Sequence, residues 1–138
     1  MHCQGFINGL PVSGARLPAE SEWEYACRAG TASLFSFGNS KDDLDRFGQV
    51  MKSSSAVVGL LEPNAWGLYD MHGNVSEWTL GRLVDYPSSA TPGRVRDQRP
   101  VHRGGSFATP AKRATSAFRS AGRFEASTGF RVVARPTR

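Results

Sequence analysis

The stretch GLYDMHGNVSEW at residues 67–78 decides our interpretation of the fold, and we call it the acidic loop. Asp70 and Glu77 lie seven positions apart in it, with the turn-forming pair Gly73-Asn74 between them. A chain that doubles back there aims both carboxylates and the intervening carbonyls toward one point, which is how proteins build calcium sites. The spacing does not match an EF-hand loop. On these residues alone, an exposed acidic turn is the simpler interpretation.

Length and composition predict one domain that spans residues 1–138. A chain of 138 residues with 39% hydrophobic residues can bury one core but not two comfortable ones. Fifteen glycines and eight prolines favour short elements joined by many turns. No apolar run approaches the length of a membrane span, and the first residues lack the pattern of a signal peptide. We therefore expect a soluble protein, with the cytoplasm as its compartment and no membrane partner.

Positive charge is concentrated in the second half of the chain. From Arg94 onward there are ten arginines and Lys112 against Asp97 and Glu125, whereas the preceding part is net negative. A basic half could contact nucleic acid or an anionic ligand. However, the arginines stand singly among small residues, without a basic helical face or paired stacking aromatics. We therefore do not expect nucleic acid to be the partner.

The cysteines and histidines do not form a recognisable site. Cys3 and Cys27 are too few for a disulfide framework, and we expect both to be reduced and buried. His2, His72 and His102 have no partner at metal-ligand spacing, so we propose no zinc site and expect surface or turn positions.

Residues 17–30 predict an amphipathic helix. Pro18 suits the first helical position, and a glycine closes the segment. Trp23, Ala26 and Cys27 fall at positions i, i+3 and i+4, which places them on one buried face.

Elsewhere the sequence predicts short elements. We expect the end of a helix or a loop at 6–16, closing in a Ser13-Gly14 turn, and a solvated loop at 39–55 with at most one helical turn. The other segments are a short strand or extended arm at 31–38, an extended segment at 57–61, a loop at 82–98, and strands at 101–107 and 129–133 flanking an arm at 117–123.

Three blocks of the sequence together resemble the formylglycine-generating enzyme, or sulfatase-modifying factor, family. They are RLPAESEWEYACRAGT at 16–31, residues 64–78, and RGGSF at 103–107 with GFRVV at 129–133. The resemblance implies a C-type lectin-like fold: an irregular, loop-rich α+β domain with a small antiparallel sheet and few short helices. Members of the family have an amino-terminal half that supplies further strands and a helix. We therefore expect the single domain at 1–138 to lack that part.

The resemblance implies a structural calcium ion in the acidic loop. The family binds this ion through two side chains and two backbone carbonyls, which fall here on Asp70, Gly73, Val75 and Glu77. These oxygen donors suit a hard cation. The family has a second calcium site in the region equivalent to residues 42–55, and we assign no ligands there.

The catalytic residues of the family are not carried over. Its oxidases use two cysteines after the Gly-Gly-Ser motif to bind copper and convert a substrate cysteine to formylglycine. Those positions are here Thr109 and either Ala114 or Thr115, and none of these residues supplies the soft thiolate that Cu(I) prefers. We therefore name no catalytic residue and expect no copper. A tryptophan of the family site is replaced by Ser76, whereas the serine of Gly-Gly-Ser is retained as Ser106.

These substitutions predict a calcium-stabilised domain that binds a peptide, a protein or a small molecule of unknown identity. The surface expected to contact the ligand comprises Ser76, Ser106, Thr109, Lys112 and Arg113. The family's relatives vary in surface residues between the Gly-Gly-Ser and Gly-Phe-Arg motifs, which suits recognition.

Enzymatic activity remains the alternative, either as an oxidase of the formylglycine-generating type or as other chemistry in the same cleft. Arginine forks can bind an anionic ligand, but we expect those of the second half to pair inside the structure. They are Arg103, Arg119, Arg123 and Arg131.

Overall fold

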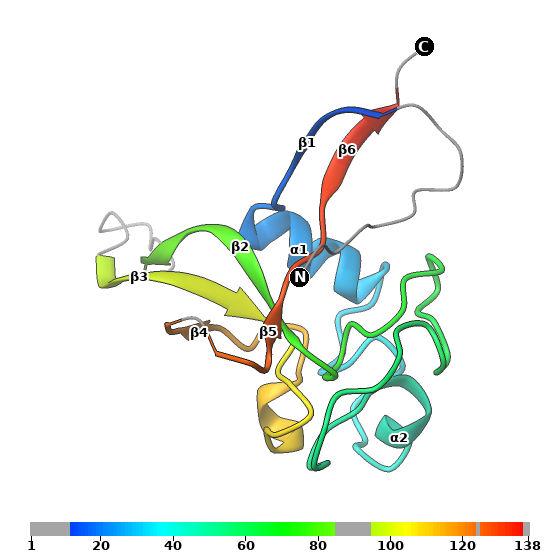
Figure 1. The fold of residues 1–138 in the computed structure, drawn as a ribbon. Helices are drawn as coiled ribbons and strands as arrows, with labels where there is room; N and C mark the ends of the chain where they lie inside the picture. Colours follow the sequence, from blue (N-terminus) through cyan, green and yellow to red (C-terminus); the bar gives the residue numbers. More distant parts are fainter. Residues whose placement is uncertain (1–11, 85–94, 124, 137–138) are drawn as a thin grey trace.

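Short elements separated by long irregular loops make up the structure, a computed structural model that describes residues 12–84, 95–123 and 125–136 (Figure 1). Their order is β1 (Val12–Arg16), α1 (Glu20–Arg28), α2 (Leu44–Phe47), β2 (Ser76–Val84), β3 (Val95–Arg103), the 3-10 helix η1 (Ala111–Arg113), β4 (Ser120–Ala121), β5 (Thr128–Gly129) and β6 (Val133–Pro136). The loop-rich α+β class predicted from the sequence is confirmed, and so is the single helical turn within residues 39–55.

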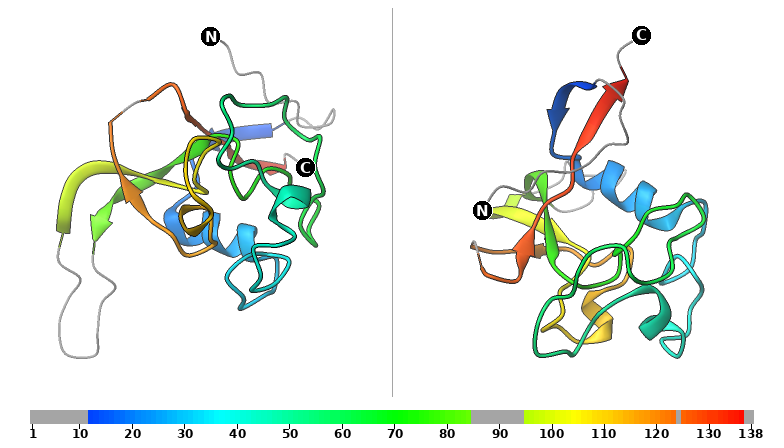
Figure 2. Two further views of the ribbon diagram at one scale, coloured as in Figure 1. Left: turned by 90° about the horizontal axis from the view of Figure 1, so that it is seen from below. Right: turned by 45° about the vertical axis from the view of Figure 1, so that its right-hand side comes forward.

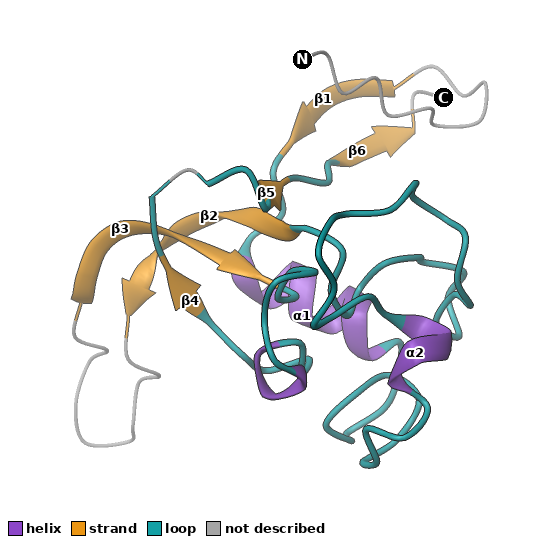
Figure 3. Cartoon of the chain, turned by 60° about the horizontal axis from the view of Figure 1, so that its bottom comes forward, coloured by secondary structure: helices purple, strands orange, loops and turns teal. Residues whose placement is uncertain are grey.

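Two small sheets and a loop-rich part surround α1 (Figures 1 and 2). The larger sheet has the strand order β4-β3-β2-β5, in which β2 and β3 are antiparallel and β5 runs parallel to β2. The smaller sheet pairs β1 with β6, so it joins the two ends of the described chain. Loops form most of the remainder, around α2 (Figure 3).

Helix α1 forms where the sequence predicts it and packs through the predicted face. The N–H of Ala19, the residue that caps the start of the helix, donates to the Glu22 carboxylate over 2.8 Å. The helix ends where Ala29 adopts a left-handed conformation with φ of +47°. Trp23 and Cys27 are fully buried, as predicted, and the Leu80 N–H donates to the Pro18 carbonyl to attach the helix start to β2.

The hairpin of β2 and β3 corrects the prediction of a loop at 82–98. Strand β2 reaches Val84 and β3 begins at Val95, and the prolines and glycine at 87–93 lie outside the described residues. These strands are not recognisable from the sequence because two of the buried residues in β2, Glu77 and Thr79, are polar. Apolar and polar residues therefore do not alternate in the pattern that indicates a strand. Pro100 also interrupts the pattern, but it lies opposite Arg82, where the pairing register shifts.

Five other segment predictions are corrected. The expected helix end or loop at 6–16 is strand β1 where it is described, and 129–133 contains the end of β5 and the start of β6 instead of one strand. The expected strand at 101–107 ends at Arg103, because two left-handed glycines follow it. Residues 31–38 form a turn with one bridge between Phe35 and Gly38, and 57–61 form an exposed turn.

His72 lies at a bend of the acidic loop, which agrees with the predicted surface or turn position only in being a turn, because the side chain is buried and connects the two hydrophobic clusters of the core. One cluster contains Trp23, Cys27 and Met71, and the other contains Phe35, Leu44, Val50 and Ala114. His72 is 1% exposed, its ring meets the Phe35 ring edge to face at 5.5 Å, and its Nε2 lies 3.8 Å from the Cys27 thiol. His102 is half-buried, and His2 and Cys3 lie outside the described residues.

Close backbone crossings hold the acidic loop in place. A Cβ atom on Gly73 would lie 2.2 Å from the Gln49 carbonyl oxygen, and a Cβ on Gly48 would lie 1.9 Å from that of His72. The Asn74 N–H donates to Gln49 over 2.8 Å at the same crossing. These positions therefore require glycine.

The helices in the described part of the chain are too short and too polar to span a bilayer.

Candidate functional site

The acidic loop contains the backbone turns that its sequence predicts. Asp70, Gly73 and Asn74 have φ angles of +57°, +116° and +62°, a conformation that changes the direction of the chain repeatedly. The Asp70 Oδ2 accepts the N–H of Gly59 over 2.7 Å, and the Asn74 Oδ1 accepts that of Ala56 over 3.0 Å. These side chains therefore already hold the neighbouring segment.

Glu77 is the centre of a buried node that it forms with Trp23 and Arg131. Its side chain is 8% exposed, and its Oε2 accepts the Trp23 Nε1–H over 2.6 Å. Arg131 forms a bidentate interaction with the Glu77 carboxylate, in which Nε donates over 2.5 Å and Nη2 donates over 2.7 Å. Arg131 Nη2 also donates to the Tyr69 carbonyl over 3.1 Å. The node thus joins α1, β2 and the segment after β5.

The predicted calcium ligands offer the right donor type but share their charge with Arg131. Burial alone would lower the pKa of Arg131, yet the negative charges of Glu77 and Asp70 raise it, so the guanidinium lies in the field of both carboxylates. Two carboxylates against one arginine leave a net charge of about −1 for a cation to neutralise. In the described ranges, no three His, Cys, Asp or Glu side chains gather into a metal-binding group. The oxygen donors of Asp70, Gly73, Val75 and Glu77 fit calcium in kind, and the assignment stays a prediction.

The predicted ligand cleft is a small hollow of about 20 Å³, which has room for about one water molecule. Of the five predicted cleft residues, the structure brings three together at this hollow, namely Ser76, Thr109 and Arg113. Ser106 is 1% exposed, and Lys112 lies on the exposed surface of η1. The remaining lining residues are His102, Gly105, Phe118 and Ser120.

The positions that hold thiols in the family's oxidases have structural roles here. Thr109 Oγ1 accepts the Ser106 N–H over 2.9 Å and donates to the Ser106 carbonyl over 3.0 Å, so its hydroxyl closes the turn. Ala114 is fully buried in the core, and Thr115 is half-buried at the end of η1. None of these side chains can act as a soft metal ligand.

Cys27 is the thiol that the described residues contain, and it is unsuited to catalysis. It is fully buried, and its Sγ lies 3.6 Å from the Ser116 hydroxyl and 3.8 Å from the Met71 carbonyl. Burial raises the pKa of Cys27 to about 12. The neutral thiol is neither a nucleophile nor a metal ligand at ordinary pH.

His72, the ring nearest to that thiol, is held neutral. Its Nδ1–H donates to the Ala114 carbonyl over 2.7 Å, which leaves Nε2 as the acceptor for the Ser36 hydroxyl at 2.9 Å. Burial lowers the pKa of His72 to about 4. The ring therefore works as a packed, hydrogen-bonded part of the core and not as a base that activates Cys27.

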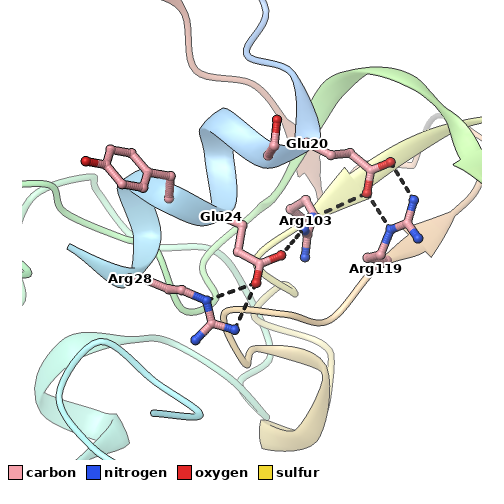
Figure 4. Close-up of a pocket in the computed structure, with 7 residues that line it drawn as sticks. Glu20, Glu24, Arg28, Arg103 and Arg119 are labelled. Atoms are coloured by element: carbon pink, nitrogen blue, oxygen red, sulfur yellow. Dashed lines mark hydrogen bonds and ion pairs between the residues drawn. The ribbon is translucent and has the colours of Figure 1, made fainter. Parts of the chain in front are cut away.

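A much larger groove runs along α1, where the sequence indicated no site. It has a volume of about 460 Å³, within the range of small-molecule pockets. Figure 4 shows charged side chains along it. Its lining residues are Glu20, Ser21, Glu24, Tyr25, Arg28, Arg103 and Arg119.

Alternating charges form a ladder in this groove, which we call the charge ladder: Arg28, Glu24, Arg103, Glu20 and Arg119. The Arg28 Nε and Arg103 Nη2 donate to Glu24 over 2.9 and 2.6 Å. Arg119 donates to both Glu20 oxygens over 2.6 and 2.8 Å. Burial alone would raise the pKa of Glu24, but its hydrogen bonds from Arg103 and Arg28 outweigh this and hold the pKa below its usual value.

Three of the four arginines expected to pair inside the structure do so. Arg103 and Arg119 belong to the charge ladder and Arg131 to the buried node, whereas Arg123 is exposed. The sequence signal that could have indicated the groove is the pair Glu20 and Glu24, which lie one helical turn apart. Their spacing places two carboxylates side by side, but the sequence does not show which distant arginines meet them.

Comparison with known proteins identifies the family. The family model described as "Sulfatase-modifying factor enzyme 1-like domain" matches residues 11–136. The mouse formylglycine-generating enzyme is 33% identical over 118 residues, which cover 69% of this chain and 31% of that protein. The mouse protein called inactive C-alpha-formylglycine-generating enzyme 2 is 38% identical over 79 residues, or 48% of this chain and 26% of that protein.

Solved structures agree with this relationship. Treponema denticola variable protein 1 superposes with a TM-score of 0.81 and 32% identity, over 95% of this chain and 50% of that one. PvdO from Pseudomonas aeruginosa has a TM-score of 0.72 and 29% identity, over 89% of this chain and 53% of that one. The chain thus spans about half the length of these structures and about a third of the mouse enzyme. The chain belongs to the sulfatase-modifying factor enzyme 1-like domain family.

Proposed function

We propose that this chain is a binding domain of its family without the family's oxidase activity. The observation that carries the proposal is the role of Thr109, whose hydroxyl is tied to both backbone groups of Ser106 where an oxidase would hold a thiol. The second thiol position is a buried alanine or Thr115. Cys27 cannot substitute, because its pKa is raised to about 12 in the core.

Similarity to a relative named as inactive supports a non-catalytic role. The mouse inactive C-alpha-formylglycine-generating enzyme 2 is 38% identical to this chain over 79 residues. Membership in this family is therefore compatible with the loss of the oxidase reaction. The chain is also similar to the mouse formylglycine-generating enzyme, so oxidase activity remains the alternative function to be tested.

The proposed contact surface is the outer face of η1 beside the hollow. Lys112 and Arg113 are exposed there, and the Arg113 guanidinium lies 5.9 Å from the centre of the Phe118 ring. The hollow itself is too small for a ligand, so a peptide, a protein or a small molecule would rest across this surface. Two exposed cations favour a partner with acidic groups.

Calcium belongs to the same proposal as a structural ion. It would be held by Asp70, Glu77 and the carbonyls of Gly73 and Val75, and it would link the two arms of the acidic loop. Glu77 accepts three hydrogen bonds already, so we expect weak binding. Melting curves with calcium and with chelator test this directly. Identical curves for the wild type and Asp70→Asn under both conditions would remove the ion from the proposal.

The decisive test of the non-oxidase proposal uses mass spectrometry. The purified protein is incubated with copper, oxygen and a peptide that carries the sulfatase cysteine motif, and the mouse enzyme serves as the positive control. We expect the peptide mass to stay unchanged with this protein. Conversion of the cysteine to formylglycine would refute the proposal and establish the oxidase alternative.

The binding surface is tested with a labelled hexaglutamate peptide as the acidic probe. Lys112→Ala and Arg113→Ala should each weaken binding about threefold to tenfold because each removes an exposed charge contact. Lys41→Ala removes a matched exposed charge elsewhere and should leave binding unchanged. Equal effects of all three variants would argue against the η1 surface. The expected cytoplasmic location is checked by fractionating cells that produce the protein.

A further inference from the structure

The charge ladder contains more guanidinium groups than carboxylates. Three arginines, Arg28, Arg103 and Arg119, and two glutamates, Glu20 and Glu24, line the groove, so its lining has a net positive charge. The two carboxylates are shared along the ladder, and Arg103 lies between them (Figure 4). This arrangement leaves the middle arginine incompletely matched.

One nitrogen atom of Arg103 lacks a hydrogen-bond acceptor. Its side chain is 1% exposed, its Nη1 donates to the carbonyls of Ser116 and Phe118, and its Nη2 donates to Glu24. Its Nε, however, is buried without a hydrogen-bond partner, and the nearest carboxylate oxygen, Glu20 Oε2, is 3.5 Å away. Buried donors are almost always satisfied, so this unsatisfied N–H indicates that the groove lacks an acceptor.

The groove also has an aromatic rim. The Tyr25 side chain lines it and is 68% exposed. The Trp66 ring meets the Tyr25 ring edge to face with the ring centres 4.9 Å apart, and Trp66 is itself 47% exposed. An apolar or aromatic group of a ligand can therefore pack on Tyr25 while an acidic group reaches the arginines.

We propose that this groove binds a carboxylate that is attached to an aromatic or bulky apolar group. A planar carboxylate matches the two parallel N–H groups of a guanidinium. The modest positive excess of the lining suits a single negative charge, whereas a phosphate dianion would also meet Glu20 and Glu24. This site is separate from the η1 surface, and it stands whether or not that surface binds a partner.

The ladder can accept the third carboxylate by a short exchange of partners. The ligand carboxylate takes the place of Glu20 on the Arg119 guanidinium. Glu20 then closes the 3.5 Å gap to the Arg103 Nε and satisfies it. Three guanidinium groups are then matched with three carboxylates, and no charged group is left without its counterpart.

Two sources could supply this chemistry, and four probes separate them. N-acetyl-L-phenylalanine represents a free acid, and a tetrapeptide ending in phenylalanine represents a peptide C terminus. The amide of each probe, identical except for the missing charge, is the matched control. Backbone amide NMR shifts of the full chain during titration locate and quantify binding.

We expect at least one of the acids to shift the resonances of α1 and of residues near Arg103 and Arg119, and its amide to bind at least tenfold more weakly. Added salt should weaken the binding of the acid. Preference for the tetrapeptide acid would assign a peptide C terminus. Equal binding of acid and amide, tighter binding of inorganic phosphate, or the absence of shifts along α1 with either acid would overturn the proposal.

Variants test the two halves of the site. Tyr25→Ala removes the exposed rim and should weaken binding of the acid about tenfold, whereas Tyr69→Ala removes an exposed tyrosine that does not line the groove. Arg119→Gln should remove the preference for acid over amide. If Arg119→Gln unfolds the protein, the Tyr25 and Tyr69 pair still decides, because equal binding by these two variants would refute the site.

Discussion

Helix α1 contributes to two glutamate–arginine clusters that look alike in composition but differ in their surroundings. In the buried node, the Glu77 side chain is 8% exposed and accepts hydrogen bonds from Arg131 and Trp23. The charge ladder borders an open groove of about 460 Å³ and leaves one buried donor unsatisfied. The difference teaches that residue type alone does not separate a structural ion pair from a candidate site; closure and hydrogen-bond satisfaction do.

The largest effect is expected in the node. Glu77→Ala leaves the Trp23 N–H buried without an acceptor and takes away the carboxylate that pairs with the partly buried Arg131 guanidinium, so we expect a loss of about 4 kcal/mol in the free energy of unfolding. Urea unfolding measures this loss.

The exposed pair of Glu62 and Arg46 is the matched control, since Arg46 likewise grips its partner through Nε and Nη2. Glu62→Gln should leave the unfolding curve almost unchanged. Similar losses for Glu77→Ala and Glu62→Gln would remove the distinction between the closed node and an ordinary surface pair.

Acid should weaken the closed core before it weakens the ladder. The pKa of His72 falls from 6.5 to about 4 on folding, so the neutral ring stabilises the native state fully above pH 6.5. This stability, about 3 kcal/mol, is lost as the pH falls from 6.5 toward 4. Glu24, whose pKa is lowered from 4.5, keeps its contribution above pH 4.5 and loses it as the pH falls further.

Unfolding of the wild type and of His72→Asn at several pH values between 7 and 4 isolates the imidazole. We expect the two stability profiles to converge with acid, because only the wild type must protonate the buried ring. Parallel profiles over this range would show that His72 is already solvated in the folded protein.

In the ladder, Glu24→Gln should cost about 2 kcal/mol, half the effect expected at the node. The amide keeps the shape but weakens the charge-assisted hydrogen bonds from Arg103 and Arg28. Thermal and urea unfolding measure the loss. A loss as large as that of Glu77→Ala would show that the ladder is as structural as the node and would weaken its interpretation as a site.

Sequence reasoning was most successful where the pattern is local or the motif is long. The helix containing Trp23 and Cys27 follows from spacing within one segment, and the three motif blocks implied the fold class that the structure has. The paired arginines were expected, but not their partners. Glu20 and Arg119, for example, are 99 positions apart.

What escaped prediction depends on contacts between distant segments. The hairpin was missed because β2 buries the polar residues Glu77 and Thr79, whose hydrogen-bond partners Trp23 and Val101 come from other parts of the chain. The burial of His72, expected at the surface or in a turn, was missed because nothing near it in sequence shows that Ser36 and Ala114 supply its hydrogen bonds. A groove, likewise, exists only after the elements that line it are packed.

The smallest effect on stability is expected at the rim of the groove. Tyr25 is 68% exposed, and its ring packs edge to face on Trp66, so Tyr25→Ala should cost about 0.5 kcal/mol. This change is near the limit of thermal unfolding, which makes the variant a clean probe of binding. If Tyr25→Ala instead destabilises the protein as much as Glu24→Gln, the tyrosine supports the fold, and its loss could no longer be interpreted as the loss of a ligand contact. A nearly unchanged melting curve combined with weaker binding of the acid would separate the open ladder from the closed node in function as well as in structure.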